Sequence, residues 1–220
     1  MTEARDAGLP VYAETCPHYL FLTQEAYDHP GFESAKYVMT PPLRDLQHQQ
    51  ALWRGLNTND VQVVSTDHCP FCFNEQPFGL KYSKQQGRDD FSKIPNGAPG
   101  IETRLPLVYN GGVRQRGLSL HRFVALTATN PAKLFGLFPH KGTIAVGSDG
   151  DIVLFNVNDT WTIRAAEQHS RVDYSLFEGH TLTGRVKKVF LRGQLIVDGQ
   201  KWHGREGMGA FLRRGSCGLL

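Results

Sequence analysis

The sequence has few cysteines, no long apolar run and no excess of charge of either sign. Four cysteines in 220 residues are too sparse for a disulfide framework. No apolar stretch approaches the roughly 20 residues of a membrane-spanning helix, and the N-terminus lacks the apolar core of a signal peptide. A net charge of +3, spread evenly, does not favour nucleic-acid binding. We therefore expect a cytoplasmic globular protein that binds neither membranes nor nucleic acid.

Two of the cysteines, Cys69 and Cys72, form a lone C-x-x-C. A structural zinc site needs a second pair of ligands, and the sequence offers none. A thioredoxin-like redox pair opens a helix, whereas residues 73–77 continue as a loop. We interpret the two residues as reduced thiols in a loop, and keep a redox pair or half a zinc site as less favoured alternatives.

What is present predicts an α/β fold. Hydrophobic residues make up 40% of the chain, enough for one large core or two modest ones. Residues 2–8 have the pattern of the last turns of a helix, followed by a strand over 9–15. Residues 49–57 predict a helix that leads into a strand beginning at Val61. Strand, long loop, helix and strand is the order typical of parallel sheets, and a start on the end of a helix suggests a piece of a longer chain.

The most informative stretch is residues 61–70. Valines at 61, 63 and 64 predict a buried strand, which ends at Asp67 and His68. Ligands bind at the carboxyl ends of parallel strands, so Asp67 is a candidate for catalysis or metal binding. An Asx turn or a helix N-cap is the structural alternative for an aspartate in this position.

Downstream, the pattern changes from helix to strand. Residues 73–100 form a second long polar loop, and helical periodicity returns with Ile101, Leu105 and Val108 and again from Leu120. A short helix is expected at Asn130, with Leu134 and Phe135 facing inward. Strands are expected at Ile144 and Val146 and over 151–155, 161–163 and 186–197. We therefore divide the chain into domains 1–140 and 141–220, the second being too short for a complete β-sandwich.

Several motifs in one order resemble the dihydropyrimidinase/hydantoinase group of cyclic amidohydrolases. They are MTPPLR (39–44), TDHCPF (66–71), KIPNG (93–97), NPAKLFGL (130–137), KGTIAVGSD (141–149) and DIVLF (151–155). The likeness covers nearly the whole chain. It implies the last strands and helices of a (β/α)8 barrel, followed by part of the family's β-sandwich.

The resemblance also implies a chemistry. Enzymes of this group hydrolyse a cyclic amide with two zinc ions, bridged by hydroxide and a carboxylated lysine. Asp67 corresponds to the aspartate after the eighth strand, which binds metal and shuttles a proton between water and the leaving nitrogen. Thr40 and Asn96 correspond to residues whose backbones hold the substrate ring. His18 and His68 are expected in the pocket wall or behind the ligands rather than on metal.

The sequence departs from the family in what it omits. It has no His-x-His motif, no strand for the bridging lysine and no strands carrying the other histidine ligands. We expect a fragment that is inactive alone, from a protein that is a homotetramer when complete. The alternative is a non-catalytic relative that keeps the fold as a structural or interaction protein, although Asp67 favours the enzyme.

Overall fold

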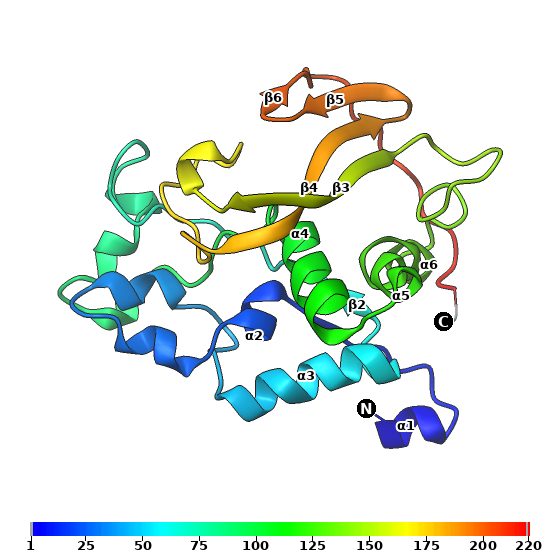
Figure 1. Ribbon diagram of the computed structural model, residues 1–220. Helices are drawn as coiled ribbons and strands as arrows, with labels where there is room; N and C mark the ends of the chain where they lie inside the picture. The colour runs from blue at the N-terminus through cyan, green and yellow to red at the C-terminus, as the bar shows by residue number, and fades with distance from the viewer. Residues whose placement is uncertain (1, 219) are drawn as a thin grey trace.

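The computed structural model describes residues 2–218 and 220. The helices are α1 (Thr2–Asp6), α2 (Pro17–Phe21), α3 (Leu46–Thr58), α4 (Arg104–Val108), α5 (Leu120–Val124) and α6 (Asn130–Leu134). The strands are β1 (Glu14–Thr15), β2 (Val63–Val64), β3 (Ile152–Thr162), β4 (Thr181–Leu191), β5 (Gln194–Asp198) and β6 (Lys201–Trp202). π-Helical segments continue α4 as Tyr109–Arg114 and α5 as Ala125–Thr129. Figure 1 shows the strands β3–β6 on one side of α4 and the helices α2 and α3 on the other.

The N-terminal half is built around a parallel strand pair. Strand β1 pairs with β2 in the register Glu14 to Val63 and Thr15 to Val64. Helix α3 lies between them in sequence and buries Trp53 and Leu56 on one face, as its periodicity predicts. It ends at Asn59, whose φ of 69° is the left-handed conformation that asparagine tolerates at a helix end. The predicted order of strand, loop, helix and parallel strand is therefore confirmed.

The C-terminal half carries an antiparallel sheet in the order β3-β4-β5-β6. Its longest pairing joins Ile152 to Phe190 at one end and Thr162 to Thr181 at the other. Strand β4 crosses the helical layer at Gly184, whose φ is +113°. A Cβ there would come within 2.4 Å of the Tyr109 ring, so only glycine allows this close approach.

The hydrophobic core consists of two clusters that meet at α4. One surrounds β2 and includes Leu20, Trp53, Leu56, Val64, Val108, Phe123 and Leu126. The other includes Met39, Leu43, Phe73, Leu107, Ile163, Tyr174 and Phe177. The second cluster thus takes residues from both predicted domains. The boundary near residue 140 stays a prediction, placed between the end of α6 and the start of β3.

The structure corrects two predictions around this junction. Ile144 and Val146 lie outside the strands and are 85% and 107% exposed, because Gly142 and Gly147 adopt left-handed φ values and form turns there. Lys141 pairs with Asp149 and Asp151, which fixes those turns by charge rather than by apolar burial. Phe135 is 54% exposed instead of inward, since α6 ends at Leu134.

Strand lengths also differ from the predicted ones. Of residues 9–15, only Glu14–Thr15 pair as a strand, because β2 offers just two partners. The predicted strands at 151–155 and 161–163 are one continuous strand, β3, with register irregularities between them. Ile101 is 56% exposed and precedes the first turn of α4. The alternation and periodicity of apolar residues thus predicted where most elements lie, but not the residues at which they begin and end.

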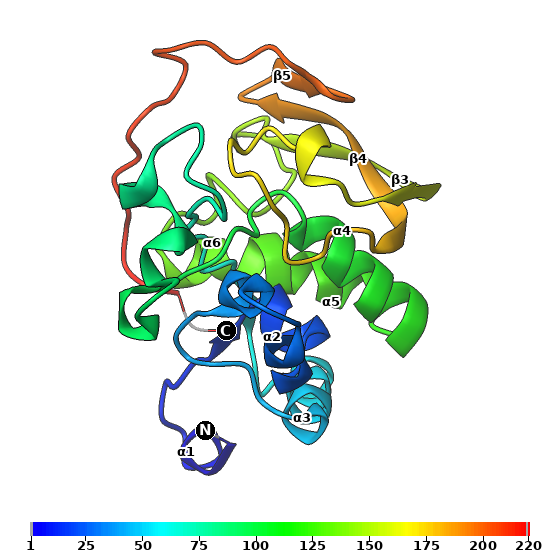
Figure 2. The same ribbon diagram turned by 90° about the vertical axis from the view of Figure 1, so that its left-hand side faces the viewer.

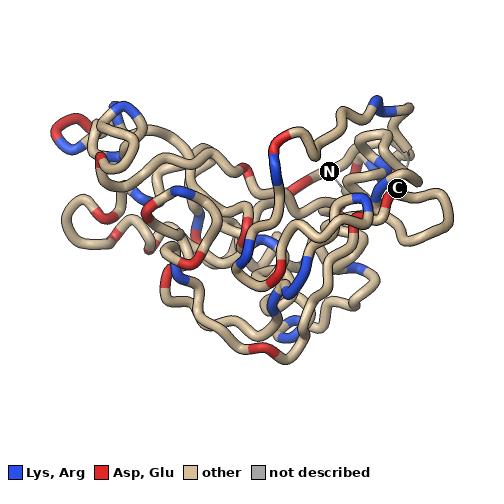
Figure 3. The backbone as a smooth tube through the Cα atoms, turned by 90° about the horizontal axis from the view of Figure 1, so that it is seen from above, with Lys and Arg blue, Asp and Glu red and all other residues tan. Residues whose placement is uncertain are grey.

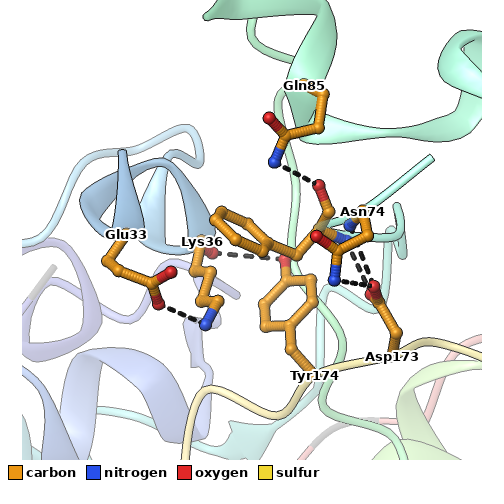
Figure 4. A network of polar contacts seen from close by, with 7 residues as sticks. Glu33, Lys36, Asn74, Gln85, Asp173 and Tyr174 are labelled. Carbon is orange, nitrogen blue, oxygen red and sulfur yellow. Dashed lines mark hydrogen bonds and ion pairs between the residues drawn. The ribbon is translucent and has the colours of Figure 1, made fainter. Parts of the chain in front are cut away.

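Two long loops are held by side chains rather than by regular structure. The first, between α2 and α3, contains short 3-10 helices at Gln24–Asp28 and Glu33–Tyr37. The second contains others at Leu80–Tyr82, Lys84–Gly87 and Phe91–Lys93. Figure 4 shows where the loops meet residues 173–174: Asp173 accepts hydrogen bonds from the amides of Phe73 and Asn74, and the Tyr174 hydroxyl donates to the Lys36 carbonyl at 3.2 Å.

The surface and the chain ends complete the description. In Figure 2 the C-terminal segment runs from the sheet back to α6, where the Gly215 amide donates to the Gly136 carbonyl at 2.7 Å. Figure 3 shows basic and acidic residues interspersed along the chain. Among the described residues, no helix has both the length and the hydropathy that crossing a membrane requires.

Candidate functional site at the carboxyl end of β2

Asp67 follows β2 and lies at the edge of a hollow of about 600 Å³. The hollow is also lined by Glu14, which lies in β1, and by Cys16 and Tyr19, which follow β1. Because β1 and β2 are parallel, their carboxyl ends meet here, and the Cys16 Sγ lies 3.2 Å from the Ser65 Oγ. Asp67 is exposed and has a φ of 44°, a left-handed conformation that aspartate tolerates better than most residues.

A partly buried cation, Arg104, supports the end of β2. The Arg104 guanidinium donates to the Val64 carbonyl at 2.8 Å and to the Thr127 carbonyl at 3.4 Å. Burial lowers the pKa of Arg104, and a nearby Cys16 thiolate would oppose that shift. Cys16 is itself buried, which raises the pKa of its thiol to about 11. Cys16 is therefore a neutral thiol at the strand end.

Thr40 and Asn96, predicted to contact a substrate, lie against each other. The Asn96 Nδ2 donates to the Thr40 Oγ1 at 2.6 Å, and the Gly97 amide donates to the Val38 carbonyl at 3.1 Å. Both side chains are exposed. Pro41, the next residue after Thr40, lines the hollow that Asp67 also lines, and its carbonyl accepts from the Tyr19 hydroxyl at 2.8 Å. Thr40 is therefore one residue away from the lining of this hollow, and Asn96 is held to it by the side-chain hydrogen bond.

His18 is buried behind the end of β1. It is 4% exposed, and its Nε2 has no hydrogen-bond partner within the described residues. Burial lowers the pKa of His18 to about 4, against the opposing charge of Asp67, so the imidazole is neutral at pH 7. Its ring packs edge-on against Tyr19 at 4.1 Å, and the hollow is lined by Tyr19 rather than by His18.

His68 faces away from this hollow. Its Nδ1 accepts a hydrogen bond from the Gly100 amide at 3.1 Å, which leaves the proton of the neutral ring on Nε2. Burial lowers the pKa of His68, and Glu102 opposes the shift. His68 lines a second hollow of about 510 Å³ together with Glu102, Trp161 and His169. The structure thus places Asp67 in the lining of one hollow and His68 in the lining of another, and it brings Thr40 and Asn96 together next to Pro41 of the first.

The metal-binding capacity of the described chain is limited. Asp67 offers an exposed carboxylate suited to zinc, but the described residues contain no group of three His, Cys, Asp or Glu side chains that could hold an ion. All four cysteines are free, with Cys69 exposed and Cys72 buried. The residues present fit one ligand position and do not by themselves hold two zinc ions.

Sequence reasoning missed the groups that shape the site from below. Tyr19 and Lys84 donate to the carbonyls of residues 41 and 97, next to the two predicted substrate contacts, and Arg104 donates to the carbonyl of residue 64 in β2. Lys84 is fully buried although it lies in a polar loop, where no periodicity marks an inward position. The only sequence signal would have been the basic residue type of Arg104 at the start of an otherwise apolar helix.

Comparison with known proteins gives a consistent result. A profile of the amidohydrolase family matches residues 43–196. The chain is 49% identical over its whole length to a D-hydantoinase of Streptomyces coelicolor and 44% identical to one of Geobacillus stearothermophilus, and it covers 45% of each of those proteins. It thus spans less than half the length of the curated relatives it matches.

Solved structures show the same similarity in three dimensions. The crystal structure of a dihydropyrimidinase from Brevibacillus agri superposes with a TM-score of 0.93 at 46% identity, over all of this chain and 46% of that one. An L-hydantoinase from Arthrobacter aurescens superposes with a TM-score of 0.83 at 30% identity. The predicted fold class is confirmed: last strands and helices of a (β/α)8 barrel, followed by part of a β-sandwich. With its profile match, its relatives and its fold in agreement, the chain belongs to the amidohydrolase family.

Proposed function

We propose that the complete protein hydrolyses the C–N bond of a cyclic amide such as a hydantoin, a dihydropyrimidine or a related cyclic ureide. Family membership and the names of the relatives, D-hydantoinase and dihydropyrimidinase, support this reaction class. The observation that carries it in this chain is the exposed carboxylate of Asp67 at the end of a parallel strand, in the lining of a hollow that Pro41, the residue after Thr40, also lines.

In this proposal Asp67 binds metal and moves a proton. Zinc, for which Asp67 would be one ligand, would supply positive charge that lowers the pKa of the attacking water. Asp67 takes the proton of that water as it attacks the amide carbon. It then returns the proton to the leaving nitrogen, so that the C–N bond breaks and the ring opens to one product that carries a carboxylate and the ureide N–H.

Thr40 and Asn96 are proposed to orient the ring through their backbones. The ring of a cyclic amide carries one N–H donor beside each carbonyl acceptor, which two facing backbone segments can bind together. The hydrogen bond between the two side chains fixes the distance between those segments. His18 is proposed to support the wall of the pocket, and His68, which lines the second hollow, to cap the turn after Asp67. The homotetramer stays a prediction.

The proposal is tested with Asp67→Asn in the complemented enzyme, meaning this chain co-expressed with the upstream segment of a related D-hydantoinase. Asparagine tolerates the same left-handed backbone, so the fold should be retained. An amide cannot accept the proton, and we expect kcat to fall by about 10²–10⁴-fold.

Asp90→Asn is the matched control, because Asp90 is partly exposed in the loop, where it caps a short 3-10 helix and pairs with the exposed Lys93. It should leave turnover of hydantoin and dihydrouracil within about twofold. An Asp67→Asn enzyme as fast as the parent would reject the assignment of Asp67. A complemented parent without turnover would favour the non-catalytic alternative.

A further inference from the structure

The buried lysine of the second long loop has no role in the chemistry proposed above. Lys84 begins the 3-10 helix Lys84–Gly87 and is 0% exposed. Its own backbone is firmly held, since its amide donates to the Cys72 carbonyl at 2.8 Å. On either side, the Ser83 Oγ and the Gln85 Nε2 both donate to the Phe73 carbonyl, at 3.1 and 2.9 Å. Figure 4 shows Gln85 in this network.

The ammonium group of Lys84 donates three hydrogen bonds, all of them to backbone carbonyls. It donates to the carbonyls of Val38 at 2.9 Å, Pro95 at 2.5 Å and Gly97 at 2.7 Å. In the part of the chain that the structure describes, the ion pairs do not include Lys84. A buried cation without a carboxylate costs desolvation energy that only close, well-aligned dipoles offset.

The three carbonyls belong to the two segments that carry the proposed substrate contacts. Val38 lies two residues before Thr40, and Pro95 and Gly97 flank Asn96. The Val38 carbonyl also accepts from the Gly97 amide at 3.1 Å, so the segments share one hydrogen-bond network. Among the side-chain hydrogen bonds of the described residues, the Lys84 Nζ is the one atom that donates to the backbones of both segments.

The network also reaches the chain just after Asp67. The Cys69 amide donates to the Ala98 carbonyl at 3.2 Å, next to Gly97. A Cβ on Gly97 would lie 2.5 Å from the Cys69 carbonyl oxygen, so this approach is close. A shift of residues 95–97 would therefore displace Cys69 and, with it, the turn that contains Asp67.

From this geometry we propose that Lys84 is a positioning residue: its ammonium group holds residues 38–40 and 95–97 together, so that Thr40 and Asn96 keep a fixed separation beside Asp67. The proposal rests on the function proposed above for Thr40 and Asn96. It assigns Lys84 no contact with substrate. Removing its three donors should loosen both segments and weaken substrate binding, while Asp67 still transfers the proton in the molecules that bind correctly.

The test compares Lys84→Met with Lys81→Met in the complemented enzyme. Methionine keeps most of the apolar stem and loses the donors, and Lys81 is an exposed lysine of the same loop. For Lys84→Met we expect KM for hydantoin to rise by about tenfold or more, with a smaller change in kcat, which corresponds to the loss of about one charge-assisted hydrogen bond. Lys81→Met should change neither constant by more than about twofold.

A second readout does not depend on turnover. Amide hydrogen exchange, followed by mass spectrometry, should become faster in peptides covering residues 36–42 and 94–100 of Lys84→Met and stay unchanged in β3 and β4. General misfolding would instead lower the apparent kcat, because fewer molecules would be active, and would speed hydrogen exchange in peptides from the whole chain. If Lys84→Met does not fold, Lys84→Gln, which retains two donors, should show the same two changes at smaller size.

The outcomes separate the two proposals. Unchanged exchange in both peptides, or a KM within about twofold of the parent in a folded variant, would overturn the role of Lys84. A parent without turnover would reject the proposed function, and the exchange measurement would still decide whether Lys84 holds the two segments.

Discussion

At the scale of single residues, the candidate site depends on where charge is exposed and where it is buried. Asp67 keeps its carboxylate exposed in a left-handed backbone conformation, which for a residue other than glycine costs about 1–2 kcal/mol. A residue keeps such a conformation only where the surrounding structure holds it there, and residues of this kind are often found at functional sites. Lys84 and Arg104 lie behind the site with their charges on backbone carbonyls.

His18 gives a pH-dependent prediction at this scale. Burial lowers the pKa of His18 from 6.5 to about 4, so between these values the unfolded chain binds a proton that the folded chain does not. Stability should therefore fall as the pH drops from 6.5 to about 4, by up to about 3 kcal/mol from this residue.

The measurement is the thermal midpoint of the complemented enzyme across this pH range. His18→Gln should flatten the acid-induced decrease, whereas His121→Gln, at an exposed position, should leave it unchanged. Equal decreases in the parent and in His18→Gln would show that His18 is not buried as a neutral ring.

At the scale of elements, the site is formed by loops that are fixed to a short strand. Strand β2 has only two paired residues, and the chain beyond it is held by residues 98–100 through the Cys69 amide and the His68 ring. Gly97 lies at the closest approach between the loop and the turn, with a φ of +139°.

Gly97→Ala should therefore destabilise the protein more than Gly79→Ala. Both glycines have positive φ values, so both substitutions cost about 1–2 kcal/mol of backbone strain. Only at Gly97 would the new Cβ collide with the backbone, 2.5 Å from the Cys69 oxygen, whereas nothing lies within 4 Å at Gly79. We expect the unfolding free energy of Gly97→Ala to be lower by at least about 1 kcal/mol than that of Gly79→Ala, from denaturant titration. Equal values would mean that the loop moves freely away from Cys69.

The elements also show what sequence reasoning could and could not provide. Val61, Val63 and Val64 predicted the buried strand, because β-branched side chains are enriched in strands, where they pack against neighbouring side chains. Ile144 and Val146 have the same alternation but lie in exposed turns, since alternation alone does not reveal a packing partner. Lys84 was missed because its burial depends on three carbonyls that are distant in the sequence.

At the scale of the whole molecule, the chain joins a barrel-like half to an antiparallel sheet through a shared core. The family resemblance located Asp67, Thr40 and Asn96, and the structure brings the last two within hydrogen-bond distance. Their roles stay predictions, as does the division into domains near residue 140. The described residues contain no group of three His, Cys, Asp or Glu side chains that could hold an ion, whereas a binuclear centre needs several ligands.

The most direct test of the account measures zinc content and turnover on the 220-residue chain and on the complemented enzyme. The chain alone should bind no zinc tightly and hydrolyse neither hydantoin nor dihydrouracil, because one carboxylate cannot hold a metal ion against water. The complemented enzyme should contain about two zinc equivalents and hydrolyse at least one of these rings. A monomeric 220-residue chain that hydrolyses hydantoin with added zinc would contradict the account.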